Sequence, residues 1–580
     1  MIHRLHIYIP LALAITGVAA AAGFGAEKSA YHAVGAPAEA KVQAHWNKYH
    51  DYGQATELLQ RMAAAYPNLA GLKSLGKSYG GREMWVLSIT NTATGDDREK
   101  PAFFVAGAIH ANEVQATEAA LYTAWYLLEM YDENPRIRHL VDHRAFYIMP
   151  MMSPDSRDAH MHRPNSTHTP RGGQRPVDDD RDGLIDEDPP DDLDGDGHIT
   201  MMRVRDPNGR WKPHPEYPNL MVRAEADQPG EFRLRGQEGF DNDGDGRVNE
   251  DGDGYYDPNR DWPWQWQPRH VQRGAYRYPL SVPENRLIVR FIIDHPNIAG
   301  AQSYHNFGGM VLRGPGPKGQ AYPAEDVAVY DAIAKNAEKT LPHYRYLDVG
   351  EDLYSVQGGT FDWFYAMRGI FTFVDELFTP HRYFHGTSDK PQDEQRAEFD
   401  RYVLFGQGTV PWHEVDHPQY GKVEVGGWTK NWGRQPPSFL LEENCHRIMA
   451  FTLYHAEQMP RVEIQSVETR RLSERLHEVT AVVANPRLTP TRAAVDRKHK
   501  ITAPDVVRIE GGDLRVVAGL ISEDPLFEEA ESRKRRPERL RVDHIPGMGA
   551  VYVRWLVEGE PPFRVTVRSL KGGQDSREVP

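Results

Sequence analysis

Residues 101–113 read Pro-Ala-Phe-Phe-Val-Ala-Gly-Ala-Ile-His-Ala-Asn-Glu, an apolar run that ends in two side chains able to bind a metal ion. The continuous apolar character of the run predicts a strand that is buried on both faces. Residues 114–131 then show the periodicity of a helix. His110 and Glu113 therefore belong to the loop between strand and helix, where both can reach one ion. The spacing alone is weak evidence, because a chain with 26 histidines contains such pairs by chance.

Strands and helices alternate along most of the chain. Residues 84–89 alternate like a strand, and further buried strands are expected at residues 145–152, 298–303 and 370–374. Helices are expected at residues 56–66, 284–294 and 327–341. This alternation predicts an α/β fold, in which a mixed, mostly parallel sheet is flanked by helices. Ligands of such sheets gather at the ends of the strands.

A third candidate metal ligand is His305, which follows the apolar run 296–301. Two imidazoles and one carboxylate leave the fourth position of a zinc ion open for water. This is the arrangement of catalytic zinc sites, whereas structural sites are closed by four protein ligands. A zinc enzyme is therefore the first hypothesis.

Three further segments supply groups that a hydrolase needs beside the metal. Two carboxylates, Asp375 and Glu376, end a β-branched and aromatic strand, which would hold a general base rigidly. Asn259 and Arg260 place an amide beside a planar cation that can bind a carboxylate in two places. Tyr354 precedes a pair of glycines, a hinge that would let its ring move onto a bound substrate.

In their order along the chain, these motifs resemble the zinc carboxypeptidase family of metallopeptidases. The resemblance extends over residues 49–457. Several motifs in one order are far more specific than any of them alone. They are Ser78-Tyr-Gly-Gly-Arg82, His110-Ala-Asn-Glu113, Asn259-Arg260, Ser303-Tyr-His305, Tyr354-(x)3-Gly358-Gly359-(x)2-Asp362-Trp363 and Thr372-Phe-(x)2-Glu376-Leu377.

The resemblance implies a hydrolase that removes C-terminal residues from peptides. His110, Glu113 and His305 look like the zinc ligands. Glu376 looks like the residue that deprotonates the zinc-bound water and later protonates the leaving amine. The zinc ion itself would acidify the water and polarise the scissile carbonyl.

The resemblance also implies how the substrate is held. Asn259 and Arg260 are similar to the pair that binds the terminal carboxylate, with Tyr354 closing over it. Phe361 falls where the family sets its side-chain preference. An aromatic residue there argues against a strict preference for lysine or arginine, which would require an acidic residue.

Two departures from the family pattern leave alternatives open. In the family, the oxyanion donor is an arginine that lies between the Pro-Asp turn, here Pro154-Asp155, and the asparagine that corresponds to Asn259. A long insertion stretches this interval in the present chain. Arg171 and Arg163 are therefore both candidates for the role, and Arg171 is favoured. The segment that ends in Glu376 is one residue shorter than in digestive members. Asp375 is therefore an alternative to Glu376 as the base.

Residues 178–257 form an acidic insertion in which one pattern recurs. Acidic or amide side chains at loop positions 1, 3 and 5, followed by glycine at position 6, are typical of calcium loops. The glutamate that an EF-hand has at position 12 is missing, so we expect shorter loops that are similar to dockerin or thrombospondin repeats. The predicted calcium ligands are Asp178, Asp180, Asp182, Asp186, Asp192, Asp194, Asp196, Asp241, Asp243, Asp245, Asn249, Asp251, Asp253 and Asp257.

The net charge of the whole chain is carried by this insertion. It contains 24 acidic and 9 basic residues, a balance of −15, and the full chain also has a net charge of −15. Since the insertion ends just before Asn259, we expect calcium to rigidify it and so to position the carboxylate-binding pair. A solvated acidic loop is the alternative.

The start of the chain predicts export. Residues 1–26 contain one arginine and then an apolar run that ends in small residues, as in a cleaved secretory signal, with an uncleaved anchor as the alternative. Cys445 is the only cysteine, so no intrachain disulfide can form, and we expect it to pack inside a helix. A secreted or periplasmic protein of a bacterium fits these features.

Three regions are therefore predicted: the signal, a catalytic unit at 45–458 and a C-terminal β-sandwich at 461–580. The basic run at 533–536 lacks interleaved aromatic residues, so it favours a solvated surface over a nucleic-acid site. Peptides or proteins are the expected substrates, with no nucleic acid partner and no membrane contact after signal cleavage. The alternative function is an inactive, calcium-stabilised protein that binds peptides or cell wall on the same scaffold.

Overall fold

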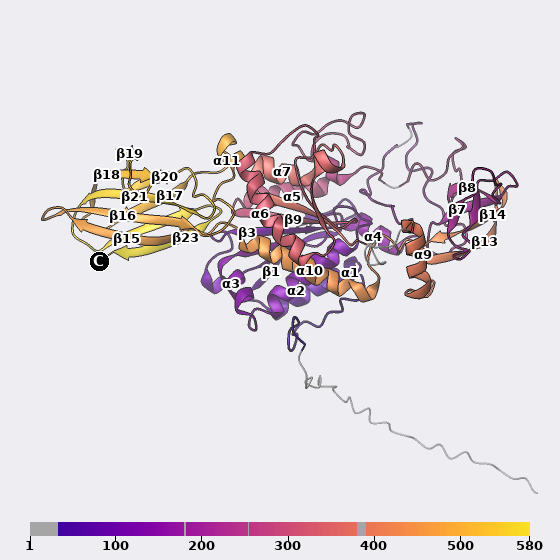
Figure 1. Ribbon diagram of the computed structural model, residues 1–580, viewed down its shortest axis with the longest axis horizontal. Helices are drawn as coiled ribbons and strands as arrows, with labels where there is room; N and C mark the ends of the chain where they lie inside the picture. Colours follow the sequence, from indigo (N-terminus) through magenta and orange to yellow (C-terminus); the bar gives the residue numbers. More distant parts are fainter. Residues whose placement is uncertain (1–32, 179–180, 253, 380–389, 580) are drawn as a thin grey trace, which may run out of the picture.

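The computed structural model describes residues 33–178, 181–252, 254–379 and 390–579. Three groups of strands follow one another along the longest axis of the molecule (Figure 1). A sheet of eight strands lies in the middle, between a six-stranded sheet at one end and a pair of sheets with five and four strands at the other. The predicted signal at residues 1–26 lies outside the described residues.

The central sheet has the strand order β1-β2-β4-β3-β9-β12-β10-β11. Its middle strands β4, β3, β9 and β12 run parallel to one another, and the edges contain antiparallel pairs. The expected mixed, mostly parallel sheet is therefore confirmed. The strands are β1 (Ala70–Lys77), β2 (Glu83–Ile89), β3 (Ala102–Gly107), β4 (Ala145–Met149), β9 (Ile298–Asn306), β10 (Met310–Arg313), β11 (Arg345–Asp348) and β12 (Phe371–Leu377).

Helices cover both faces of this sheet because its strands are apolar on both sides. Alternate residues of β3 show this directly: Phe103 and Val105 belong to one buried cluster, Phe104 and Ala106 to the other. The first cluster contains side chains of α1 (Tyr52–Ala65), α2 (Gln115–Glu129), α3 (Pro135–His143), α6 (Ala324–Thr340) and α10 (Ser438–Glu457). The second contains side chains of α5 (Pro283–Asp294) and α7 (Thr360–Arg368). A further helix, α4 (Pro154–His162), follows β4.

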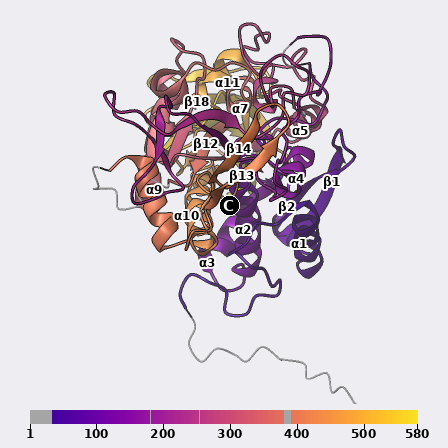
Figure 2. The ribbon, with the colours of Figure 1, turned by 90° about the vertical axis from the view of Figure 1, so that its right-hand side faces the viewer.

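A six-stranded sheet, with the order β13-β14-β5-β8-β6-β7, was not predicted from the sequence. Four of its strands come from the acidic insertion, and the other two come from residues 409–428, which pair with them across a long stretch of chain. The view in Figure 2 has this sheet on the near side, with β13 and β14 beside α9 (Gln392–Tyr402). The strands are β5 (Met201–Arg205), β6 (Trp211–Pro213), β7 (Met221–Arg223), β8 (Phe232–Gln237), β13 (Thr409–His417) and β14 (Gly421–Trp428).

The C-terminal residues form two antiparallel sheets with a common apolar core, as expected for a β-sandwich. Inward and outward side chains alternate along β16, and its Val479, Ala481 and Val483 belong to one buried cluster with Val507 and Val567 of the other sheet. One sheet contains β15 (Glu463–Arg471), β16 (Leu476–Asn485), β18 (Arg515–Ser522), β19 (Glu531–Arg533) and β21 (Gly549–Glu558). The other contains β17 (Asp505–Glu510), β20 (Arg539–Val542), β22 (Phe563–Ser569) and β23 (Gly573–Val579).

Buried polar contacts connect the sandwich to the central unit. Asp326 of α6 accepts hydrogen bonds from the backbone amides of Ala494 and Val495, at the start of α11 (Ala494–His499). In the described part of the chain, no helix combines the length and the apolar character that crossing a bilayer requires.

Candidate metal centre

The three side chains expected to bind zinc lie together and are buried. The Nδ1 atoms of His110 and His305 are 3.0 Å apart. The carboxylate of Glu113 lies 3.0 Å from each of them, through Oε1 and Oε2 respectively. A tetrahedral zinc ion needs ligand atoms roughly 3.3 Å apart, so these residues fit the metal.

The topology of the sheet explains why residues so distant in sequence meet. His110 and Glu113 follow β3, and His305 lies near the end of β9. Because β3 and β9 are parallel neighbours, their carboxyl ends open at the same edge of the sheet. Although burial opposes ionisation, the two imidazoles hold the pKa of Glu113 well below its usual value. The cluster therefore presents a carboxylate and two ring nitrogens to one point.

Asp257 contacts this cluster and does not lie with the calcium loops, in contrast to the sequence prediction. Its Oδ1 is 3.1 Å from Nε2 of His110. Burial opposes ionisation of Asp257, but Arg260 and His110 hold its pKa well below its usual value. An ionised carboxylate accepts the Nε2 proton of His110, which leaves the Nδ1 lone pair directed at the metal position.

Glu376 lies beside the cluster, and Asp375 lies on the opposite face of β12. In the parallel pairing of β9 with β12, Glu376 is opposite His305. Burial and the charge of Glu113 raise the pKa of Glu376 to about 7, a value suited to a general base at neutral pH. Successive residues of a strand point to opposite faces, so the fully buried Asp375 points away from the metal position.

Arg171 reaches the cluster, as predicted, whereas Arg163 does not. The Nη1 atom of Arg171 lies 2.8 Å from Oε1 of Glu113, and its Nη2 lies 3.1 Å from Nε2 of His110. If Nε2 of His110 donates its proton to Asp257, the 3.1 Å approach of Arg171 to this nitrogen is a contact without a hydrogen bond. Arg163 lines surface hollows beside α4.

A second guanidinium, that of Arg434, lies near the same carboxylate and was missed by the sequence analysis. Its Nη1 is 3.6 Å from Oε1 of Glu113 and donates to the backbone oxygen of Asn306 at 2.8 Å. Its Nη2 lies 3.0 Å from Nδ1 of His168. No pattern near residue 434 signals this position, because the contact forms only when the segment after β14 folds back over the site.

Asn259 and Arg260 lie in a short 3-10 turn next to Asp257. The side-chain oxygen of Asn259 accepts hydrogen bonds from the backbone amide and the hydroxyl of Thr360, at 2.8 and 2.6 Å. These bonds orient the side-chain amide nitrogen away from α7. The Arg260 guanidinium lies 3.6 Å from Asp257 and keeps 11% of its side chain exposed. Asn259 is buried, so the pair is fixed next to the metal cluster with little of its surface exposed.

Tyr354 and Phe361 lie in very different surroundings. Tyr354 is 54% exposed, and it follows the short helix Val349–Leu353. After it comes Gly358, which has a φ of +67° that favours glycine. Phe361 is buried in a small apolar cluster whose other members are Leu312, Val349, Val356 and Val374.

Comparison with known families gives this site a context. The model of the zinc carboxypeptidase family matches residues 55–169 and 238–391, which include His110, Glu113, His305 and Glu376. The matched part of the chain belongs to the zinc carboxypeptidase family. The residues between the two matched segments contain most of the acidic insertion, and Arg434 lies beyond the second segment. A second model, described only as a domain of unknown function, matches residues 461–580.

Curated carboxypeptidases are similar to part of this chain. A zinc carboxypeptidase of Saccharothrix mutabilis subsp. capreolus is 35% identical over 107 residues, 18% of this chain and 24% of that protein. Human carboxypeptidase D is 37% identical over 112 residues, 19% of this chain and 8% of that protein. The matched region thus spans a quarter or less of the length of these relatives.

Solved carboxypeptidase structures also resemble the chain. Thrombin activatable fibrinolysis inhibitor is 15% identical, with a TM-score of 0.43, and the match covers 71% of this chain and 77% of that one. Carboxypeptidase A of Helicoverpa armigera is 17% identical, also with a TM-score of 0.43, covering 72% and 75% of the two chains.

The acidic insertion of this protein brings only some of the predicted calcium ligands together. Asp241, Asp243 and Asp245 form one group of neighbouring carboxylates, and Asp192 and Asp194 belong to a second. Asp182 belongs to a third group, which it shares with Asp243. Three glutamates that the sequence analysis missed complete such groups, namely Glu187, Glu238 and Glu250.

The remaining predicted calcium ligands lie elsewhere or are not described. The Asp178, Asp186 and Asp196 side chains accept hydrogen bonds from backbone amides of their own loop, and Asn249 donates to the backbone oxygen of Glu238. Asp251 is buried, and its backbone oxygen accepts a hydrogen bond from the amide of Asp188. Asp180 and Asp253 lie outside the described residues.

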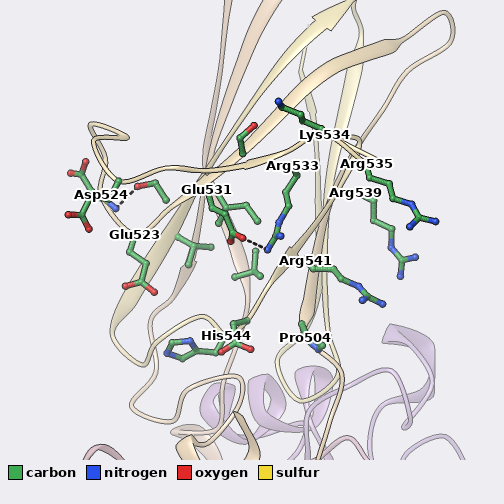
Figure 3. A pocket seen from close by; sticks show the side chains of 17 residues that line it. Pro504, Glu523, Asp524, Glu531, Arg533, Lys534, Arg535, Arg539, Arg541 and His544 are labelled. Atoms are coloured by element: carbon green, nitrogen blue, oxygen red, sulfur yellow. Dashed lines mark hydrogen bonds and ion pairs between the residues drawn. The ribbon is translucent and has the colours of Figure 1, made fainter. Parts of the chain in front are cut away.

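A hollow of about 1000 Å³ in the C-terminal sandwich is built from charges of both signs (Figure 3). The basic run at 533–536 contributes to its wall, and Arg533 pairs with Glu531 at 2.8 Å. Glu523 and Asp524 lie across the hollow from Lys534 and Arg535. A lining with charges of both signs is typical of a solvated surface, whereas a nucleic-acid site would need a surface of positive charge.

Proposed function

We propose that this protein is a zinc-dependent carboxypeptidase that hydrolyses the C-terminal peptide bond of its substrate. The observation that carries the proposal is the convergence of His110, Glu113 and His305 next to Glu376. These residues offer three ligands and a base, and the family is defined by this metal chemistry. When bound there, zinc lowers the pKa of a water molecule and polarises the scissile carbonyl.

Each neighbouring side chain has a defined task in this reaction. Glu376 accepts the proton of the attacking water, and it returns a proton to the leaving nitrogen when the carbon–nitrogen bond breaks. Arg171 donates hydrogen bonds to the oxygen that becomes negative, because its guanidinium lies against the metal cluster. Asp257 holds the ring of His110 in place.

Asn259 and Arg260 are the proposed holders of the substrate carboxylate. The Asn259 oxygen is already used by Thr360, so its amide nitrogen is the group that remains for a ligand. Arg260 adds a planar cation, and Tyr354 is exposed and able to move. The apolar surroundings of Phe361 support a preference for apolar or aromatic terminal residues.

We also propose export by the N-terminal signal and calcium binding by the acidic insertion. The support for calcium is the grouping of carboxylates in the folded insertion, since hard cations prefer oxygen ligands. The role of calcium would be structural, because these groups lie outside the metal cluster of the sheet.

A library of peptides with free or amidated C-termini, analysed by mass spectrometry, tests the proposed activity. We expect loss of the terminal residue from free peptides, with apolar residues preferred. Replacing Glu376 with glutamine should lower kcat by about 100- to 10,000-fold while zinc is retained. Asp375→Asn is the matched control, and it should keep most of the turnover because Asp375 faces away.

Two results would contradict the proposal. One is a wild-type, zinc-loaded protein that binds the peptides but releases no terminal residue, which would favour the inactive binding protein. The other is activity that survives Glu376→Gln and disappears in Asp375→Asn, which would reassign the base.

A further inference from the structure

Glu238 is a fully buried carboxylate within the acidic insertion. Its Oε1 accepts a hydrogen bond from the backbone amide of Thr200 at 2.5 Å. Its Oε2 is buried and has no hydrogen-bond partner among the residues that the structure describes. Burial, reinforced by Asp194, Asp192 and Asp196, raises the pKa of Glu238 to about 8. A buried acid next to other acids is costly unless a cation or a proton neutralises it.

The unpartnered carboxylate faces a loop at residues 192–198. Carboxylate oxygens of Asp192, Asp194 and Glu238 all lie within 4.8 Å of one another. Within the loop, Asp192 accepts hydrogen bonds from the backbone amides of Gly195 and Gly197, at 2.8 Å each. The carboxylates are thus held in place by the backbone, although they repel one another.

Strand pairing explains how Glu238 reaches this loop. In the antiparallel pair of β5 and β8, Met201 is opposite Gln237, so Glu238 comes next to the end of the loop. Position 12 of the loop is Arg203, which instead pairs with Glu424. The fold therefore replaces the acid that the loop lacks in its own sequence by an acid from a neighbouring strand.

We propose that a calcium ion binds between Asp192, Asp194 and Glu238, with Glu238 in the role that the last glutamate has in an EF-hand. All of these ligands are oxygens, which suits calcium better than zinc. His413 lies 3.0 Å from Oδ2 of Asp194 and can hydrogen-bond that oxygen while the other binds the ion. The inference rests on the proposed calcium binding of the insertion, and it does not require peptidase activity.

Such an ion would stabilise the contacts that connect the loop at residues 192–198 to the metal centre. The loop continues into His198, which forms an isolated bridge with Asn165, and Ile199 donates to the backbone oxygen of Asn165. Residues 165–171 lead directly to Arg171, which contacts Glu113. An ion at Glu238 therefore fixes the segment from which Arg171 projects.

Calcium titration of the full, zinc-loaded chain after treatment with a calcium chelator tests this site. Calorimetry should show one fewer bound calcium per chain in Glu238→Gln than in the wild type, and the rise of Tm with calcium should be smaller. Without calcium, the variant should unfold at a temperature close to that of the wild type, because an amide of the same shape replaces the buried carboxyl group. Asp505→Asn removes a buried acid of the sandwich and should leave the calcium response unchanged.

Crystals of the wild type soaked with terbium, a calcium substitute with strong anomalous scattering, test the site even if the variant does not fold. We expect a peak between Asp192 and Glu238. An unchanged calcium count in Glu238→Gln, or no peak at this position, would overturn the proposal. The calcium count is independent of peptide hydrolysis, so a failure of the proposed activity remains distinguishable.

Discussion

A ligand histidine needs a partner for the ring nitrogen that does not bind the metal, and here Asp257 provides it. From the sequence, Asp257 is predicted to end a calcium loop, because the repeating acid pattern runs up to it. In the structure its carboxylate is 3.1 Å from Nε2 of His110 and is held ionised by Arg260. The residue therefore acts on the metal through His110.

Replacing Asp257 with asparagine should weaken zinc binding by about 10- to 100-fold, since an amide orients the imidazole less well and lowers its basicity. Competition with a chromogenic zinc chelator measures this. Asp245→Asn, in an exposed loop of the same insertion, should leave zinc affinity as it is. If Asp257→Asn lowered the calcium content and left zinc binding unchanged, the original calcium prediction would be restored.

At the scale of elements, α10 places a histidine in the hydrophobic core, and this residue makes the stability of the fold depend on pH. His455 is fully buried between the rings of Phe103 and Phe373, at centroid distances of 4.9 and 5.1 Å. Neither ring nitrogen has a hydrogen-bond partner among the described residues. Burial lowers the pKa of His455 from 6.5 to about 3, so the folded state holds the neutral ring.

Acid should therefore destabilise the protein through this residue. Between pH 6.5 and about 3 the unfolded chain binds a proton at His455 that the folded chain excludes, so stability falls as the pH falls below 6.5. His455→Leu should remove about 2 kcal/mol of this loss at pH 5. Urea unfolding at pH 7 and pH 5 measures the difference, and the exposed His499→Leu is the control. Equal acid sensitivity of wild type and His455→Leu would disprove the assignment.

At the scale of the whole molecule, one buried lysine fastens the sandwich to the catalytic unit. Lys571 is 3% exposed and donates to the backbone oxygens of Arg368 and Gly369, both at 2.7 Å. These carbonyls lie at the end of α7, just before the strand that carries Glu376. Lys571 of the sandwich thus donates hydrogen bonds to the last carbonyl groups of a helix in the catalytic unit.

Lys571→Met should lower the free energy of unfolding by about 1 to 3 kcal/mol, because two buried carbonyls lose their donor. Chemical unfolding followed by tryptophan fluorescence measures the change. Lys534→Met, at an exposed position of the same sandwich (Figure 3), should have no such effect. Similar stability of both variants would show that the contact contributes little to the connection of the two units.

Much of the central fold was predictable because it depends on local patterns. The apolar runs that became β3, β9 and β12 are buried on both faces, and such strands are recognisable without knowing their neighbours. The positions of His110 and Glu113 follow from the turn between β3 and α2. These features depend on side chains that are close together in the sequence.

Contacts between distant segments could not be predicted in the same way. The acid pattern placed Asp257 and Asp192 in equivalent loops, but only folding brings Asp257 to His110, and only the pairing of β5 with β8 brings Glu238 to Asp192. Arg434 likewise reaches Glu113 from a segment that carries no motif. The periodicity of a segment indicates which of its residues are buried. The partner of a buried charge depends instead on strand register and on the path of the chain, and neither can be predicted from a single segment.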